Sequence, residues 1–283
     1  MMADPMIGES AAGPSFFERG LAALPLLVPG LAGLAYLALF GAPNSYVLIN
    51  AGALMAGSAW ALFGWFPKSD MLERGGAIAV LLLLALTLRL GPEVEGITRW
   101  FTLGGFTLHV GLTVIPVLAV LSARDEELGP YLLLAALIIA TFQPDAASTL
   151  ALTGAAFGLA LAEHDRRAAA IGGLGLFATA WASLRPNLAP QPFVERVIAD
   201  LWPEAPVASI LLGLSLLASV TLILRAPSAS SAPNFSLAGA LAGFIAAALL
   251  GDYPTPLIGY GAASIIGLGL ALPAIRETKA AAS

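Results

Sequence analysis

The sequence contains no cysteine, which excludes disulfide bonds, thiolate metal sites and thiol nucleophiles. It has two histidines, His109 and His164, which are too few for a haem–copper or multi-histidine metal centre, and we expect neither to be catalytic. Charge is scarce as well, because only 11% of the 283 residues are charged, against about 25% in soluble domains. The net charge of −5 forms no basic block. The scarcity of cysteine and histidine leads us to expect no metal and no cofactor, and the lack of a basic block leads us to expect no nucleic-acid partner.

Apolar residues dominate what remains, at 58% of the chain, and the mean hydropathy is +0.87. Apolar runs that end at charges or prolines predict an all-α, polytopic transmembrane bundle, since about 20 apolar residues cross a bilayer as a helix. Joining the fifth and sixth runs would bury Asp145 at mid-membrane, so we prefer ten spans to nine. Glycines such as Gly239 and Gly243 predict close helix packing within this bundle. The ten predicted spans cover residues 20–41, 45–66, 75–91, 104–122, 129–142, 146–163, 167–184, 205–225, 234–251 and 256–275.

Basic residues divide unevenly between the two sides of this arrangement. The side that carries both termini holds nine Lys and Arg residues, and the opposite side holds the other four of the 13. The positive-inside rule then places both termini in the cytoplasm. We expect a cytoplasmic extension at 1–19, the transmembrane bundle at 20–275 and a cytoplasmic tail at 276–283. No Asp or Glu lies in the interior of a predicted span, which argues against an ion-coupled transporter.

Three short stretches carry a resemblance to a known family. Residues 96–106 read GITRWFTLGGF after the third span, residues 143–149 read QPDAAST after the fifth, and residues 256–264 read PLIGYGAAS at the start of the tenth. In this order and spacing they resemble motifs of the SEDS family, the RodA/FtsW-like membrane proteins. The resemblance implies a ten-helix fold in the bacterial cytoplasmic membrane. It also implies polymerisation of lipid II into glycan strands beside a single-span class B penicillin-binding protein.

Two departures from the family pattern affect the expected chemistry. Where the family has Q-P-S-E-L-x-K, this chain reads HVGLTVI from His109 onward, without the Glu or the Lys. In the fourth external loop, residues 193–200 read FVERVIAD, and this match puts Pro192 where the family has its presumed catalytic aspartate. Proline cannot act as an acid or a base. Glu195 and Asp200 are the nearest substitutes and the candidate catalytic residues, although an amphipathic interfacial helix over 193–202 would also account for them.

The three matching stretches also supply candidate ligand-binding residues. Arg99 beside Trp100 in an external loop could hold a lipid diphosphate bidentately, or the two could anchor the protein at headgroup depth. Asp145 could bind a cation or a sugar hydroxyl, or it could cap the helix that starts there. Gln143 and Tyr260 complete the predicted ligand-binding set. A structural role for Tyr260 in a bent start of the last span is the alternative.

These observations predict a SEDS-like bundle that has lost glycosyltransferase chemistry and serves as a scaffold or lipid-binding subunit of a cell-envelope complex. Its expected partners are membrane lipids, with a polyprenyl-diphosphate lipid among them, and another membrane protein, such as a single-span subunit. A lipid II polymerase that uses Glu195 or Asp200 is the enzymatic alternative, and a lipid-linked substrate flippase is the third. The scaffold differs from the polymerase in needing no external carboxylate and from the flippase in needing no central polar cavity.

Overall fold

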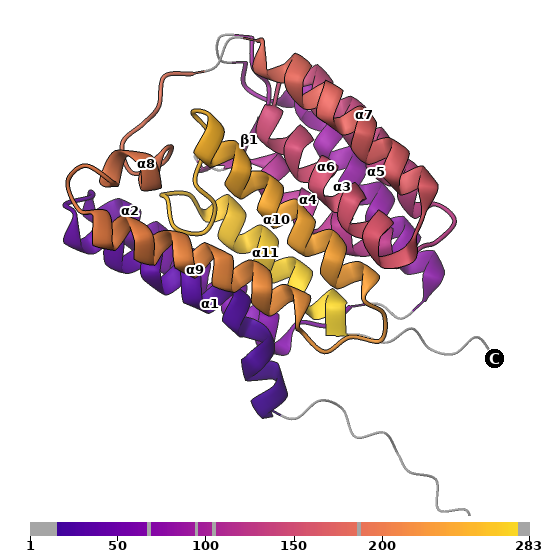
Figure 1. Ribbon diagram of the computed structural model, residues 1–283, viewed down its shortest axis with the longest axis horizontal. Coiled ribbons are helices and arrows are strands. Elements are labelled where there is room, and N and C mark those ends of the chain that lie inside the picture. Colours follow the sequence, from indigo (N-terminus) through magenta and orange to yellow (C-terminus); the bar gives the residue numbers. More distant parts are fainter. Residues whose placement is uncertain (1–15, 67–68, 94–95, 104–105, 186–187, 277–283) are drawn as a thin grey trace, which may run out of the picture.

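The computed structural model describes residues 16–66, 69–93, 96–103, 106–185 and 188–276. Residues 1–15 of the predicted extension (1–19) and residues 277–283 of the predicted tail (276–283) lie outside the described residues. Within the described ranges the chain forms ten long helices, one short helix and one antiparallel hairpin (Figure 1). The elements are α1 (Phe16–Leu39), α2 (Asn44–Phe63), α3 (Asp70–Leu90), β1 (Trp100–Leu103), β2 (Phe106–His109), α4 (Val110–Ala123), α5 (Gly129–Phe142), α6 (Ala146–Glu163), α7 (Arg166–Ser183), α8 (Val197–Leu201), α9 (Pro206–Leu224), α10 (Ala232–Leu250) and α11 (Ala262–Arg276).

The long helices have the length and composition of membrane spans. Among the described residues, six of them are long and apolar enough to cross a bilayer, and three more are shorter but apolar. Helix α7 has 18 residues but is less apolar. Large apolar side chains also point outward, as on α9, where Val207 and Leu211 are 70% and 61% exposed. Lipid is the solvent that such a surface requires, so the predicted polytopic membrane fold is confirmed.

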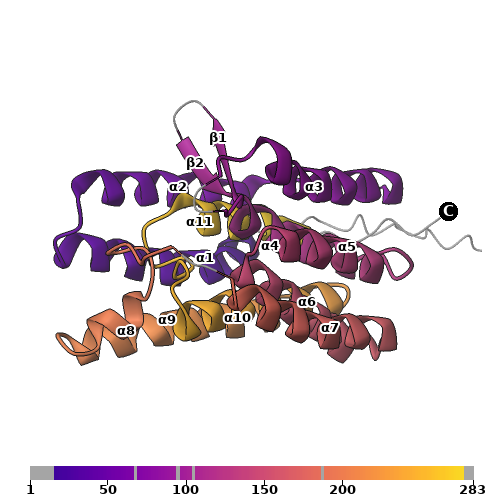
Figure 2. The same cartoon turned by 90° about the horizontal axis from the view of Figure 1, so that it is seen from above.

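The helices form one bundle with a tightly packed centre. Helices α6 and α10 lie side by side (Figures 1 and 2). A Cβ atom added at Gly154 would overlap the carbonyl oxygen of Gly239, and a Cβ atom at Gly239 would overlap that of Gly154. Gly243 approaches the backbone of Leu150 in the same way. These glycines let the two backbones come into contact, as their small size predicts.

Three predicted spans have boundaries that the structure corrects. The span expected over 104–122 is a helix only from Val110, because Phe106–His109 pairs with Trp100–Leu103 as a hairpin strand. The span expected over 256–275 begins at Ala262, since the preceding segment turns through Leu257 and Gly261 at φ +67° and +147°. The span expected from residue 75 begins earlier, at Asp70.

The interfacial helix expected over 193–202 is also shorter than predicted. It is reduced to α8, which has 5 residues. Phe193 and Arg196 both adopt positive φ angles, of 67° and 54°, in the left-handed region that interrupts a right-handed helix. The segment before α8 is therefore an irregular loop that crosses the end of the bundle.

One end of the bundle is held together by charged side chains. Glu73, in the first turn of α3, is buried and accepts two hydrogen bonds from Arg124, with Nη2–Oε1 at 2.6 Å. Arg124 also donates to the carbonyl of Ala274 at 2.8 Å, which ties α3, α4 and α11 together. A buried carboxylate at a helix end departs from the expectation that carboxylates lie outside the spans. The pairing is what makes this burial tolerable.

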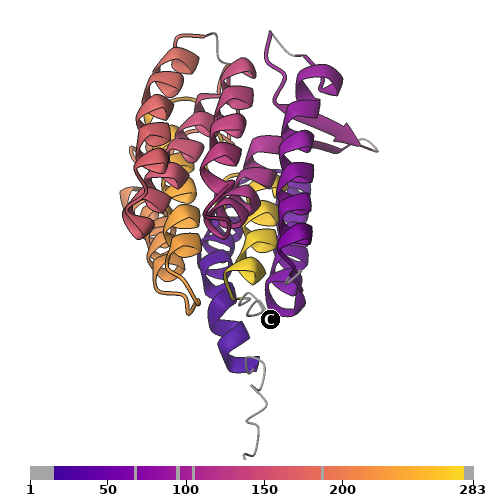
Figure 3. The same cartoon turned by 90° about the vertical axis from the view of Figure 1, so that its right-hand side faces the viewer.

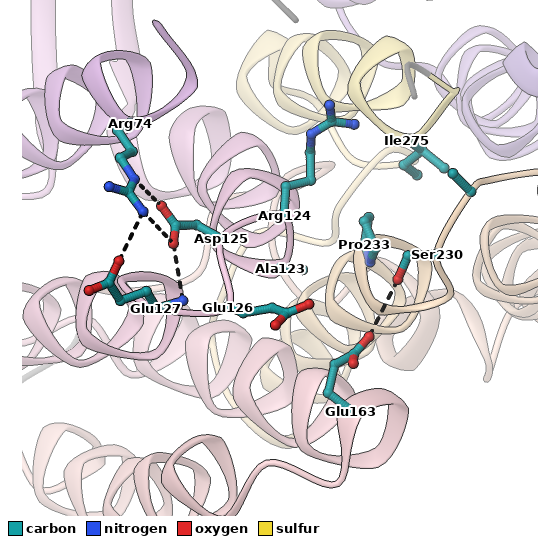
Figure 4. Close-up of a pocket in the computed structure, with 11 residues that line it drawn as sticks. Arg74, Ala123, Arg124, Asp125, Glu126, Glu127, Glu163, Ser230, Pro233 and Ile275 are labelled. Carbon is teal, nitrogen blue, oxygen red and sulfur yellow. Dashed lines mark hydrogen bonds and ion pairs between the residues drawn. The ribbon is translucent and has the colours of Figure 1, made fainter. Parts of the chain in front are cut away.

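A small pocket of about 380 Å³ opens at this same end. Figure 4 shows Arg74 beside Asp125 and Glu127, with which it forms ion pairs at 2.6 and 3.2 Å. Glu163, at the end of α6, accepts a hydrogen bond from Ser230 at 3.3 Å. The pocket thus lies among the loops that the charge distribution places in the cytoplasm.

The two ends of the bundle allow a direct test of topology. The start of α1 and the end of α11 lie at one end, and the hairpin lies at the other (Figure 3). We expect a cysteine in place of exposed Glu204 to react with an impermeant maleimide in intact cells, and one in place of exposed Ala229 to react only after lysis. The chain has no other cysteine to interfere. The reverse labelling pattern would invert the assigned orientation.

Candidate ligand-binding site

The three motif-bearing stretches, far apart in the sequence, meet at the end of the bundle that carries the hairpin. Residues of the first and third stretches surround a cavity of about 800 Å³, and Asp145 of the second lies beside Arg99 without lining it. Two further segments complete its wall, α2 and the loop that precedes α8. The lining includes Ile49, Arg99, Trp100, Thr107, His109, Gln191, Glu195, Thr255, Tyr260 and Ser264.

Arg99 is the buried cation of this cavity. It precedes β1, and its side chain is 3% exposed. The guanidinium lies over the ring of Trp100 at 4.7 Å and the ring of Tyr253 at 5.7 Å, two contacts that hold it in place. Its Nη1 lies 3.9 Å from Oδ1 of Asp145, too far for a hydrogen bond. Among the described residues, neither Nε nor Nη1 has a hydrogen-bond acceptor.

Such an arrangement is unusual because buried polar groups are nearly always paired. A buried guanidinium with free N–H groups at the wall of a cavity is poised to bind an anion. An Arg that served as an interfacial anchor would instead extend its charge into water, whereas Arg99 is buried. The position of Arg99 therefore favours ligand binding over the anchoring alternative.

Asp145 is fully buried behind Arg99 and caps α6. It accepts hydrogen bonds from the backbone N–H of Ser148 at 3.2 Å and from its hydroxyl at 2.6 Å. Burial works against its ionisation, but His109, Arg99 and Ser148 outweigh burial and hold the pKa of Asp145 below its usual value. Asp145 is thus a carboxylate that both caps a helix and faces the guanidinium. It is not among the residues that line the cavity.

His109 completes this buried group from the end of β2. Burial lowers the pKa of His109 to about 4, so the ring is neutral near neutral pH. Its Nδ1 accepts a hydrogen bond from the backbone N–H of Leu112, which leaves the ring proton on Nε2. That Nε2 lies 3.3 Å from Oδ2 of Asp145. A neutral histidine therefore lies beside Asp145 without adding a second positive charge near neutral pH.

Gln143, which the sequence suggested as a ligand-binding residue, lies elsewhere. Its side chain is buried and donates hydrogen bonds to the carbonyl of Leu84 at 2.7 Å and to the hydroxyl of Thr87 at 2.6 Å. It joins the end of α5 to α3 and is not among the residues that line the cavity. Its contacts are those of a structural residue.

Tyr260 lines the cavity and belongs to a loop held from two sides. Its ring stacks on Tyr46 with centroids 3.6 Å apart, and its backbone N–H donates to the carbonyl of Phe193 at 2.6 Å. Asn50, buried in α2, donates to the carbonyl of Gly259 at 2.9 Å and accepts from the N–H of Gly261 at 3.0 Å. Sequence reasoning missed Asn50, although a lone Asn in an apolar run was a signal.

The two candidate catalytic carboxylates are separated by the structure. Glu195 lines the cavity, where its Oε2 accepts a hydrogen bond from the N–H of Gln191 at 2.7 Å. Burial raises the pKa of the Glu195 carboxyl. Asp200 is exposed on α8 and pairs with Arg196 at 3.2 Å, outside the cavity lining. Only Glu195 of the two is placed to contact a ligand.

A second, apolar cavity of about 520 Å³ adjoins the first. Ile49, Leu108 and Ala262 line both, so the two cavities adjoin at these side chains. Helices α2, α3, α4 and α11 and the hairpin contribute its walls. Leu48 on its rim is 71% exposed, on a surface that faces lipid in a membrane. A polar cavity with a cation therefore lies next to an apolar one at the edge of the bundle.

These features together define a polytopic helical membrane protein with a polar cavity at one end of its bundle. Two of the solved structures that resemble it are of the rod shape determining protein RodA of Thermus thermophilus. The first is 20% identical with a TM-score of 0.64, covering 89% of this chain and 94% of that one. The second, an aspartate-to-alanine mutant, is 19% identical with a TM-score of 0.61, covering 91% and 96%.

A third similar chain comes from a structure described as a peptidoglycan synthase complex that coordinates polymerization and crosslinking. It is 20% identical with a TM-score of 0.61, and the match covers 90% of this chain and 96% of that one. No protein-family model matches this sequence, and no curated protein matches it either. The RodA-like fold implied by the three sequence motifs is confirmed by these structural matches.

Proposed function

We propose that this protein is a lipid-binding subunit of a cell-envelope complex in the bacterial cytoplasmic membrane, and that it lacks glycosyltransferase activity. The external cavity holds the phosphate head of a polyprenyl lipid, and the adjoining apolar cavity holds the first part of its chain. The observation that carries this proposal is the buried guanidinium of Arg99, whose Nε and Nη1 have no acceptor among the described residues.

The shape and chemistry of the two cavities support a lipid with an anionic head. Phosphate oxygens match the planar guanidinium bidentately. The apolar cavity is lined by Leu48, Gly52, Ala56, Leu83 and Ile266, among others, and Thr113 is the one residue of the described lining with a polar side chain, so the cavity offers a prenyl chain a mainly apolar contact. A soluble phosphate compound would leave this cavity unused, whereas a prenyl chain fills it.

The loss of polymerase chemistry is inferred from the fourth external loop. Glycosyl transfer to a hydroxyl needs a positioned base to accept the proton of that hydroxyl. Pro192 occupies the position at which the resemblance places a carboxylate. Residual polymerase activity that uses Glu195 is the second candidate, because Glu195 lines the cavity beside Arg99.

A flippase is less well supported, because it would need a polar route between the two sides of the membrane. The external cavity and the pocket among the predicted cytoplasmic loops share no lining residue. Between them α4 presents fully buried apolar side chains, including Leu118 and Ala119. In the described part of the chain, packed apolar side chains therefore separate the two polar sites.

The neighbouring structure of a peptidoglycan synthase complex supports a role within an assembly. We propose that this chain likewise associates with another membrane protein, such as a single-span subunit. Its outward apolar faces, such as that of α9, are compatible with a helix-to-helix contact in the membrane. Purification in a mild detergent should retain that subunit.

Binding of a polyprenyl phosphate to the purified full-length chain in nanodiscs tests the proposed function. A Cβ atom at Gly52 meets open space in the apolar cavity, so we expect Gly52→Leu to fill it and weaken binding by about tenfold. Gly213 on α9 also faces open space but not this cavity, so Gly213→Leu is the matched control and should bind normally. Equal binding by both variants would place the lipid chain elsewhere.

A further inference from the structure

Two charged side chains of opposite sign line the external cavity. Arg99 offers buried N–H groups that have no acceptor among the described residues, and Glu195 presents a carboxylate. No other Asp, Glu, Lys or Arg belongs to the described lining. A ligand whose phosphate pairs with Arg99 therefore meets a negative charge on the wall of the same cavity.

The balance of charge around Arg99 limits how much negative charge a ligand can bring. Asp145 lies 3.9 Å from Arg99 and already offsets part of its charge. His109 is neutral near neutral pH and adds none. One cation thus faces two carboxylates before any ligand enters. Like charges repel strongly where water is excluded, so each added negative charge costs more here than in solution.

The remaining polar groups of the lining are neutral. The hydroxyl oxygen of Thr255 accepts a hydrogen bond from the N–H of Val197 at 3.2 Å, which leaves its proton free to donate into the cavity. Thr107 adds a second hydroxyl. Neutral donors of this kind complete the hydrogen bonds of a single phosphate group. They do not neutralise a second one.

We infer that the cavity selects a polyprenyl monophosphate over the corresponding diphosphate, and that Glu195 is the residue that makes this selection. This inference rests on the proposed function and specifies the head group. The phosphate of the preferred lipid pairs with Arg99. In a diphosphate the second phosphate has no cation left and approaches the carboxylate of Glu195.

Competition binding with three soluble probes tests the selection. Farnesyl monophosphate, farnesyl diphosphate and inorganic phosphate are titrated against the purified full-length chain in nanodiscs, in EDTA and again in Mg²⁺. We expect the monophosphate to bind more tightly than the diphosphate by about tenfold or more in both buffers. Inorganic phosphate, which lacks a chain for the apolar cavity, should compete only weakly.

The role of Glu195 is tested with a matched pair of variants. Glu195→Gln removes the charge but keeps an oxygen that can accept from Gln191, and we expect the preference for the monophosphate to fall to about twofold or less. Asp200→Asn removes a charge from nearby α8, outside the cavity, and should leave the preference for the monophosphate unchanged.

The outcomes separate this inference from the proposed function. Diphosphate binding as tight as monophosphate binding, in either buffer, would overturn the selection but leave a lipid-binding protein. A preference that persists in Glu195→Gln would overturn the role of Glu195. Inorganic phosphate that competes as well as farnesyl monophosphate would show a site for free phosphate, and no binding of either prenyl probe would refute the proposed function itself.

Discussion

Purified protein incubated with labelled lipid II should form no glycan strands, whether alone or with a class B penicillin-binding protein. Loss of a general base typically lowers a rate by about 10²- to 10⁴-fold, so the remaining turnover should approach background. Pro192 is the central reason, because it stands where the resemblance places the catalytic aspartate. The measurement is the yield of polymer from lipid II, with an active RodA as the positive control.

Glu195 is the one carboxylate of the described cavity lining that could replace the missing base. Its Oε2 is engaged by the N–H of Gln191, and a catalytic group must be placed closely against the reacting hydroxyl. The variants Glu195→Gln and Asp200→Asn decide its role if polymer does form. Polymerisation that Glu195→Gln abolishes and Asp200→Asn preserves would establish Glu195 as a relocated base and refute the proposed loss of activity.

The membrane fold could be predicted from the sequence because its main determinant is local. Each long apolar run must become a helix in the bilayer, since every backbone N–H and carbonyl must be paired within the segment. The charges and prolines between the runs then mark the loops. The ten predicted spans correspond to the ten long helices of the described residues for this reason.

The ends of the spans were less predictable because they depend on contacts between segments. The run 104–122 is mainly apolar and contains no Asp, Glu, Lys or Arg, and such a run does not distinguish a short strand from the first turn of a helix. The strand forms because Phe106–His109 finds a partner in Trp100–Leu103. The start of α11 likewise depends on Asn50, which is 209 residues away from Gly259 in sequence.

The site could be predicted only in part. The resemblance pointed to Arg99 and Tyr260, and both line the cavity. It pointed equally to Gln143, which instead bonds to Leu84 and Thr87 of α3, and nothing in its motif distinguishes the two roles. The burial of Arg99 depends on Tyr253, a residue with no motif of its own. Only the assembled bundle brings these side chains together.

Replacement of Arg99 by alanine should weaken the binding of a polyprenyl phosphate by about ten- to a hundredfold. A hydrogen-bonded contact to a charged group is worth about 1.5 to 3 kcal/mol, and about 1.4 kcal/mol corresponds to a tenfold change in affinity. Arg99→Lys should recover only part of this loss, because an ammonium group cannot reproduce the planar, bidentate contact. Binding to nanodiscs with a labelled prenyl phosphate measures the effect.

Arg185 provides the matched control for this prediction. It lies at the same end of the bundle and stacks on Trp181 at 4.9 Å, but it is exposed and does not line the cavity. If Arg99 acted only by general attraction to an anionic lipid, replacing either Arg99 or Arg185 by alanine should weaken lipid binding to a similar extent. Because Arg185 does not line the cavity, we instead expect Arg185→Ala to bind normally. Since Arg99→Ala also removes a neighbour of buried Asp145, its fold is checked by size-exclusion chromatography. A folded Arg99→Ala protein with unchanged affinity would reduce Arg99 to an anchor and remove the main support for the proposed site.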